Sequence, residues 1–159
     1  MPKEHLRQQI LKQLQAEVEL QTEAALLARE EAISEESRAE SKYDTHSQEA
    51  AYLAEGQARL AAEAMDSIKV YHSLSLDDLP PGSPVSLGAL VEVSAQGQST
   101  WYLLGPRAGG LELNLADGTP VLVITPQSPL GRQLLGKAVG SKVQLADQKS
   151  VDCHITQIL

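Results

Sequence analysis

Apolar residues in the first forty positions recur at helical spacing. They return every fourth residue along one side, and Ala, Glu, Gln and Leu, all good helix formers, dominate the segment. This pattern predicts a long amphipathic helix with one apolar stripe. The stripe consists of Leu6, Ile10, Leu14 and Val18, with Leu11, Ala25 and Ala32 nearby on the same side.

A second apolar stripe follows at nearly heptad spacing, formed by Leu53, Leu60, Ala64, Ile68 and Tyr71. Two successive stripes can bury one another only if the chain turns back on itself. Residues 1–72 are therefore predicted to form an antiparallel helical hairpin, a coiled coil whose arms would each be roughly 45–57 Å long.

The turn of this hairpin is expected within residues 40–48, where the sequence ESKYDTHSQEAAY begins. Asp44 and its polar neighbours can cap a new helix, and Glu49 can supply a favourable negative charge in its first turn. Asp44 and Glu49 are the acidic residues of the predicted turn and of the helical turn that follows it. The tip of the hairpin is therefore expected to carry carboxylates.

The second half of the chain changes to strand-like patterns. Residues 73–84 hold three prolines and a glycine, which indicates a linker. Beyond it, apolar runs of strand length predict a small, mostly antiparallel sheet over residues 85–159. One short helix is expected in SPLGRQLLGK, with Ser128 as its cap and Pro129 at its first position. The predicted strands lie in LGALVEVSA (87–95), TWYLLG (100–105), GLELNLA (110–116) and PVLVITP (120–126), with a final hairpin formed by SKVQLA and VDCHITQIL. The expected fold class is α+β.

Composition narrows the possible functions. The 159 residues carry a formal charge of −8 and a pI of about 4.9, which disfavours broad electrostatic binding to nucleic acid. Cys153 is the only cysteine, so an internal disulfide is excluded. No apolar run approaches the roughly 20 residues of a membrane helix, and the first residues lack the apolar core of a secretion signal. A cytoplasmic protein without membrane contact is expected.

Two stretches of the second half resemble the bacterial Gre-type transcript-cleavage and elongation factors (the GreA/GreB family). GSPVSLGALVEVSAQGQSTWYLLGP is similar to the family's opening strands, in which a G-A-x-V-x-V strand precedes one that ends in V/L-G-P. ITPQSPLGRQLLGKAVGSKVQL is similar to the signature S-P-[IL]-[AG]-R-x-L-[IL]-G-K followed by V-G-D-x-V. The resemblance implies an FKBP-like domain over residues 85–159. It also implies that the hairpin enters the secondary channel of RNA polymerase.

The resemblance also gives the tip a specific chemistry. Gre factors carry D-x-x-E-N-A-E-Y there, and its Asp and Glu help to retain a second Mg²⁺ at the polymerase active centre. The nearest equivalent here is DTHSQEAAY, in which Asp44 and Glu49 are five residues apart rather than three and the Asn is absent. By resemblance, both carboxylates would act on Mg²⁺ shared with the polymerase, and the chain would have no cofactor of its own. Alternatively, Asp44 is a helix cap and Glu49 a first-turn acid, each worth about 1 kcal/mol or less.

In the second half, the resemblance places Gln127, Ser128, Pro129 and Leu130 in the family's polymerase-docking turn. The leading hypothesis is therefore an RNA polymerase-binding factor that modulates elongation or rescues backtracked complexes, and that is not an enzyme alone. A non-cleaving competitor for the channel is one alternative. Another is a coiled-coil interaction module, related to the polymerase regulator of nucleoside diphosphate kinase. The hairpin hypothesis predicts an elongated monomer.

Overall fold

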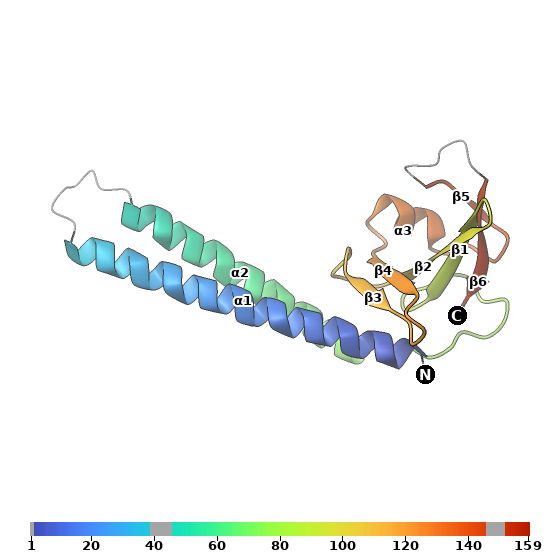
Figure 1. Cartoon of the computed structure of the whole chain (residues 1–159), viewed down its shortest axis with the longest axis horizontal. Coiled ribbons are helices and arrows are strands. Elements are labelled where there is room, and N and C mark those ends of the chain that lie inside the picture. The colour runs from blue at the N-terminus through green and yellow to red at the C-terminus, as the bar shows by residue number, and fades with distance from the viewer. Residues whose placement is uncertain (1, 39–45, 146–151) are drawn as a thin grey trace. The chain divides into compact units, whose positions relative to one another are not determined.

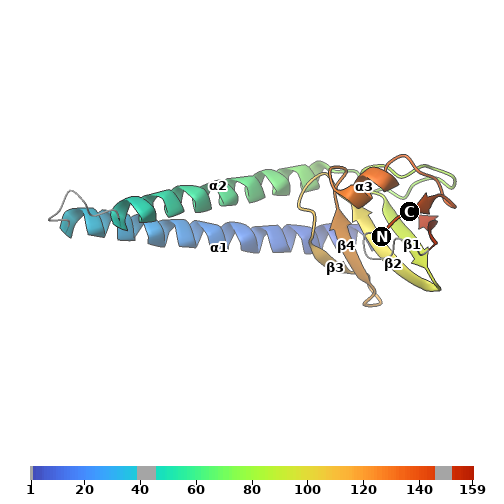
Figure 2. The same cartoon turned by 90° about the horizontal axis from the view of Figure 1, so that it is seen from above.

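The computed structural model describes residues 2–38, 46–145 and 152–159 of the chain. Two long helices come first: α1 (Pro2–Arg38) and α2 (His46–Ser73). They lie side by side as an antiparallel hairpin (Figures 1 and 2). A mixed sheet with one short helix follows, so the predicted α+β class is confirmed. Its elements are β1 (Leu90–Ala95), β2 (Gln98–Leu104), β3 (Glu112–Asn114), β4 (Pro120–Ile124), α3 (Pro129–Leu134), β5 (Lys142–Val143) and β6 (Cys153–Ile158).

The chain divides into two compact units, and the division falls inside both long helices. Residues 11–69 form one unit, called here the hairpin unit. Residues 1–10 and 70–159 form the other, the sheet unit, which therefore includes the start of α1 and the end of α2. The predicted domain boundary stands at residue 72, a few residues from this division, and stays a prediction.

The seam of the hairpin unit is made mainly of small side chains. On α2 most of the buried and half-buried positions follow a heptad pattern, and four of these are alanines. The predicted stripe is wrong at two positions of α2, because Leu53 and Leu60 are 55% and 47% exposed. Small side chains let two helices approach closely, and the bulkier residues then lie outside the contact. The seam comprises Leu14, Val18, Gln21, Ala25, Ala28 and Ala32 of α1, with Ser47, Ala50, Ala54, Gln57, Ala61, Ala64 and Ile68 of α2.

In the sheet unit, the strand order is β3-β4-β2-β1-β6-β5. Four of the five strand pairs are antiparallel, as predicted, and β2 pairs with β4 in parallel. Between β1 and β2 the two turn residues Gln96 and Gly97 both have positive φ, 50° and 78°. Positive φ at both positions defines the tight turn whose twist suits a two-residue hairpin.

Both faces of this sheet carry buried side chains. One face packs with α3, and its core includes Tyr102, Leu104, Ile124 and the fully buried Leu134. Side chains that alternate with these along β2 and β4 point to the opposite face. There Leu103, Val121 and Val123 are buried, with Leu113 of β3 beside them. Leu6 and Tyr71, from the helix ends that belong to this unit, have no exposed surface.

Polar contacts hold the start of α1 within the sheet unit. The Gln9 side chain donates to the Asn114 carbonyl (2.7 Å) and accepts from the Asn114 N–H (2.9 Å), so it covers part of the edge strand β3. Arg7 donates to the carbonyls of Tyr71 (2.5 Å) and His72 (3.1 Å), which lie at the end of α2 and lack helical partners. Lys3 donates to the Asp77 carbonyl (3.1 Å). These contacts join segments that are far apart in the sequence.

Candidate functional site

The predicted tip lies only partly within the described residues. Glu49 is exposed in the first turn of α2, as predicted. Asp44 lies outside the described ranges, so the approach of the two carboxylates stays a prediction. In the part of the chain that the structure describes, no group of three or more His, Cys, Asp or Glu side chains is placed to hold a metal ion. The Mg²⁺ assigned to Asp44 and Glu49 is accordingly still an expectation.

The predicted docking turn is built around the cap of α3. Ser128 has extended backbone angles (φ −71°, ψ 154°), and its Oγ accepts from the Gly131 N–H at 3.1 Å. The same hydroxyl donates to the Thr125 carbonyl at 2.7 Å. Pro129 occupies the first helical position, where its missing N–H costs nothing. The predicted cap and helix start are therefore confirmed.

The residues of this turn divide into exposed and structural ones. Gln127 and Pro129 are exposed, whereas Leu130 is half-buried and packs against the core. Gly131 is buried so closely against the turn that a Cβ atom there would collide with the Thr125 carbonyl oxygen. The exposed surface of the turn consists mainly of Gln127 and Pro129.

The helix behind the turn is fixed at its other end. The Gln133 side chain donates to the Gln144 carbonyl (2.8 Å) and accepts from the Gln144 N–H (2.7 Å). The Gly136 N–H donates to the Val85 carbonyl (2.8 Å), and Gly136 has a positive φ of 79°, suited to a helix end. Because both ends are tied, the predicted docking turn is held in one orientation within the sheet unit.

The Tyr71 side chain, at the end of α2, packs against Gly105 of the sheet unit. Its hydroxyl donates to the Arg107 carbonyl (2.5 Å), and a Cβ added at Gly105 would collide with this hydroxyl. Burial raises the pKa of Tyr71 to about 12. Burial also lowers the pKa of Lys3, and the nearby carboxylates of Asp78 and Asp77 oppose this shift. The glycine that ends the strand in the L-G-P pattern therefore makes room for the end of α2.

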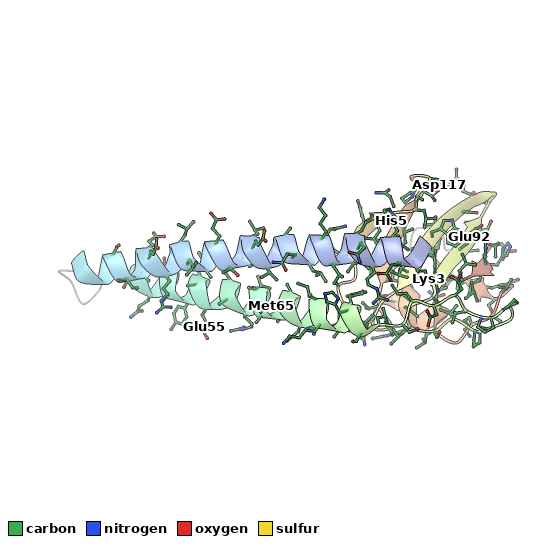
Figure 3. The ribbon with its side chains drawn as sticks, turned by 90° about the horizontal axis from the view of Figure 1, so that it is seen from below. Lys3, His5, Glu55, Met65, Glu92 and Asp117 are labelled. Atoms are coloured by element: carbon green, nitrogen blue, oxygen red, sulfur yellow. The ribbon has the colours of Figure 1, made fainter. Side chains whose placement is uncertain are left out.

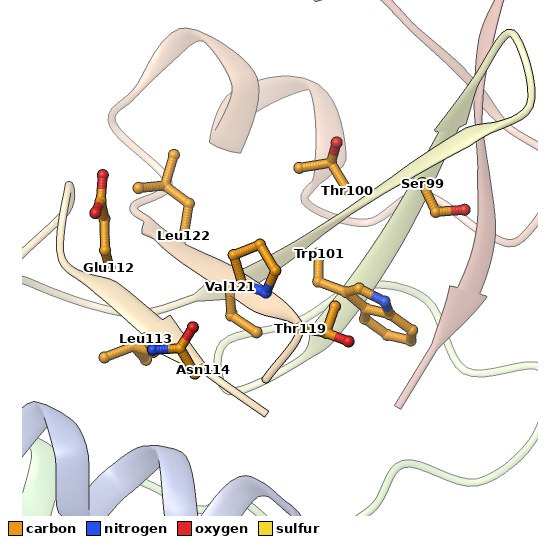
Figure 4. Close-up of a pocket in the computed structure, with 10 residues that line it drawn as sticks. Ser99, Thr100, Trp101, Glu112, Leu113, Asn114, Thr119, Val121 and Leu122 are labelled. Carbon is orange, nitrogen blue, oxygen red and sulfur yellow. The ribbon is translucent and has the colours of Figure 1, made fainter. Parts of the chain in front are cut away.

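Two concave surfaces were not predicted from the sequence. The first, with a cavity volume of about 390 Å³, lies on β2, β3 and β4 beside the half-buried Trp101 (Figure 4). The sequence predicts Trp101 as a core or half-buried sheet residue, but a strand pattern does not show which strands lie beside it. The lining comprises Ser99, Thr100, Trp101, Glu112, Leu113, Asn114, Thr119, Pro120, Val121 and Leu122.

The second surface, called here the hairpin groove, has a volume of about 470 Å³ and lies in the hairpin unit. Its lining is largely apolar, and Glu55 and Met65 belong to its α2 wall (Figure 3). The sequence feature that points to this groove is the set of apolar residues beside the predicted stripes. The α1 wall is formed by Thr22, Ala25, Leu26 and Arg29, and the α2 wall by Ala54, Glu55, Ala58, Ala61, Ala62 and Met65.

Comparisons with known proteins find matches among solved structures alone. No family model and no curated protein matches the sequence. Among solved structures, the chain is similar to GreA factor homolog 1 (Gfh1) of Thermus thermophilus, with 22% identity over 94% of each chain and a TM-score of 0.36. It is also similar to Gfh1 of Thermus aquaticus, with 23% identity over 95% of this chain and 92% of that one, at a TM-score of 0.37. A third structure, titled the transcription factor Gfh1, has 20% identity over 94% and 90% of the two chains, and a TM-score of 0.39.

With TM-scores below 0.5, these likenesses do not establish a common fold or function. Among the described residues, no helix has both the length and the apolar character needed to span a membrane. The evidence for function therefore lies in the sequence signature and in the geometry of the docking turn.

Proposed function

We propose that this chain is an RNA polymerase-binding transcription factor. The docking turn binds the rim of the secondary channel, and the helical hairpin enters the channel to modulate elongation or to rescue backtracked complexes. The proposal is supported by the resemblance of SPLGRQLLGK and of the preceding strands to Gre-type factors. A long hairpin joined to a small sheet domain, as this resemblance implies, agrees with it.

One observation carries the proposal more than any other. Within the signature, Gly131 and Leu134 are buried and have structural roles, whereas Gln127 and Pro129 are exposed at the start of a helix tied at both ends. The residues that the resemblance assigns to docking are thus available to a partner. Folding alone accounts for Ser128 as the cap and Pro129 at the first helical position, and exposed Gln127 is available to contact a partner.

The first experiment measures binding of the full chain to bacterial core RNA polymerase. Replacing Gln127 and Pro129 together with alanine should weaken binding by about tenfold, because two central interface side chains commonly contribute about 1 kcal/mol or more. The matched control replaces Gln98 and Gln157, two exposed residues of the sheet unit, with alanine and should bind as the parent does. If the parent protein does not bind polymerase, the proposed function is wrong.

The action at the tip needs a separate assay, transcript cleavage by a backtracked elongation complex. Carboxylates brought beside a bound metal can help hold a second ion or orient a water molecule. If Asp44 and Glu49 act in this way, the parent protein stimulates Mg²⁺-dependent cleavage, and Asp44→Ala or Glu49→Ala abolishes the stimulation. The chemistry would still be that of the polymerase, so the chain would not be an enzyme by itself.

The spacing of the tip acids favours a second version of this function. Asp44 and Glu49 are five residues apart, and Gln48 and Thr45 stand at the family's Glu and Asp positions when Tyr52 is aligned with its tyrosine. A factor with this tip would occupy the channel without stimulating cleavage. In the same assay it would bind polymerase, leave cleavage at its intrinsic rate and compete with an active cleavage factor.

A further inference from the structure

The hairpin groove is an unusual surface for an isolated coiled coil. Its walls expose large apolar side chains, since Leu26 is 55% and Met65 50% exposed. A two-stranded coiled coil needs apolar residues only at the two seam positions of each heptad. A helix that also packs against a third or fourth helix has an additional apolar position beside the seam. In the hairpin unit, exposed apolar residues flank the seam at seven-residue spacing. The pairs are Leu20 and Leu27, Leu26 and Ile33, and Leu53 and Leu60; of these six side chains, Leu26 belongs to the groove lining.

The two walls of the groove differ in size and in charge. The α1 wall carries the bulky Leu26 and the cation Arg29. The α2 wall carries small alanines and the anion Glu55, which also lies 3.9 Å from Arg59 of its own helix. A bulky, basic wall next to a small, acidic wall is complementary to itself after a twofold rotation. The charged side chains that line the groove are one Arg and one Glu, so the lining has no net charge.

We propose that the hairpin groove binds a second copy of this chain, in place of the monomer expected from the sequence. The two copies would have to separate before a hairpin entered a channel. A twofold axis along the hairpin would lay α1 of each copy on α2 of the other. Leu26 of one copy would then enter the space above Ala54 and Ala58 of the other, and Arg29 would face Glu55. The result is a four-helix arrangement in which each copy supplies both halves of the contact.

The charge of the whole unit argues against a tight dimer at low salt. Residues 11–69 contain 13 acidic and 6 basic side chains, a net charge of −7. Two such surfaces repel one another at long range, and salt screens this repulsion more strongly than it weakens a close pair. Self-association should therefore become stronger as ionic strength rises. A basic helix from another protein would show the opposite dependence.

Charge reversal gives the most direct test, with the full chain followed by sedimentation velocity over a wide concentration range. Arg29→Glu alone and Glu55→Arg alone each place like charges at both symmetric contacts, and each should weaken the dimer by about tenfold. An equimolar mixture of the two variants should dimerise again, because every contact then joins opposite charges. Lys12→Glu and Glu30→Arg make the same charge changes at exposed positions outside the groove, and they should change association much less, through the net charge alone.

An apolar pair of variants tests the shape. Leu26→Gln should weaken dimerisation, whereas Leu20→Gln, at a similarly exposed position of α1 outside the groove lining, should not. Circular dichroism of both variants verifies that the helices are intact. A parent chain that stays monomeric at all concentrations and salt levels overturns the proposal, and so does a mixture of reversed variants that fails to associate. These readouts do not involve polymerase, so they are independent of the proposed function.

Discussion

Gly105 and Tyr71 should be strongly coupled in stability, because they occupy the same space in the sheet unit. In the Gly105→Ala variant, the new Cβ would collide with the Tyr71 hydroxyl and lie 3.1 Å from the ring carbon that bears it. The Val123 Cγ1 atom is 3.3 Å away, so the site has little room to relax. Overpacking of this kind typically costs roughly 1–3 kcal/mol, and we expect about 2 kcal/mol here.

Tyr71→Phe removes the hydroxyl and reveals the coupling. Alone it should cost about 1–2 kcal/mol, since the Arg107 carbonyl loses the donor that lies 2.5 Å from it. In the double variant, however, the Cβ added at position 105 no longer meets an oxygen. Gly105→Ala should therefore cost at least about 1 kcal/mol less when Tyr71→Phe is already present than in the parent.

Urea unfolding followed by tryptophan fluorescence suits this cycle, because Trp101 is the only tryptophan and lies in the sheet unit. The matched control is Gly97→Ala combined with Tyr71→Phe. Gly97 has open space around its Cβ position, so it has no steric link to Tyr71, and its own cost comes from a positive φ. Its effect should add to that of Tyr71→Phe. If the Gly105 and Tyr71 effects are also additive within about 0.5 kcal/mol, the close contact described here does not govern stability.

Single groups give three further expectations. Burial raises the pKa of Tyr71 to about 12, so the folded state favours the neutral phenol. The stability that this preference contributes, on the order of 2 kcal/mol, should be fully present below pH 10 and lost as the pH rises to 12. Alkaline unfolding should show this loss in the parent and not in Tyr71→Phe. Gln57→Met should stabilise the hairpin unit by about 1 kcal/mol, because among the described residues no donor reaches the buried Oε1 of Gln57. An unchanged or lowered melting temperature at the helical CD band would contradict this. Gly131→Ala should lower the free energy of unfolding by about 1–3 kcal/mol, because the added Cβ meets the Thr125 carbonyl oxygen. Ser128→Ala removes the helix cap and should lower it by about 1 kcal/mol. If urea unfolding shows the larger loss for Ser128→Ala, the Thr125 carbonyl does not constrain the turn.

Features set by neighbouring residues were predictable from the sequence. The cap at Ser128, the proline at the first position of α3 and the glycine after its end each follow from backbone chemistry within a few residues. The same holds for the strand positions, whose apolar runs alternate or end at turn residues. The helix start at Ser128 and Pro129 was predicted for this reason, whereas the docking role of the turn came from the resemblance alone. The structure added which side chains of the turn are exposed.

The seam of α2 was predicted only in part, because periodicity alone allowed two registers. Leu53 and Leu60 are seven residues apart, and so are Ala54 and Ala61. The larger hydrophobicity of leucine favours the first register, yet the structure uses the second. Close packing between two helices depends on both surfaces together, and the pattern of one helix does not contain that information.

Pairings between distant segments were also beyond the sequence. Strand β4 lies between β2 and β3, parallel to β2 and antiparallel to β3, and the apolar pattern of a strand does not specify its neighbours. The contact between Gln9 and Asn114 joins residues 105 positions apart through amide groups that have no distinctive spacing. The hairpin groove was not predictable for a related reason, since its two walls come from different helices.

The stretches that resemble Gre-type factors contain two kinds of residue, those needed for folding and those exposed to a partner. Gly105 belongs to the L-G-P pattern, yet Tyr71 explains it, because only glycine leaves room for the phenol. Gly131 is explained in the same way by the Thr125 carbonyl. A protein could retain both glycines to keep this fold and bind no polymerase at all. Exposed Gln127 and Pro129 have no comparable structural explanation beyond the helix start, so the polymerase-binding proposal depends on them and should be tested there first.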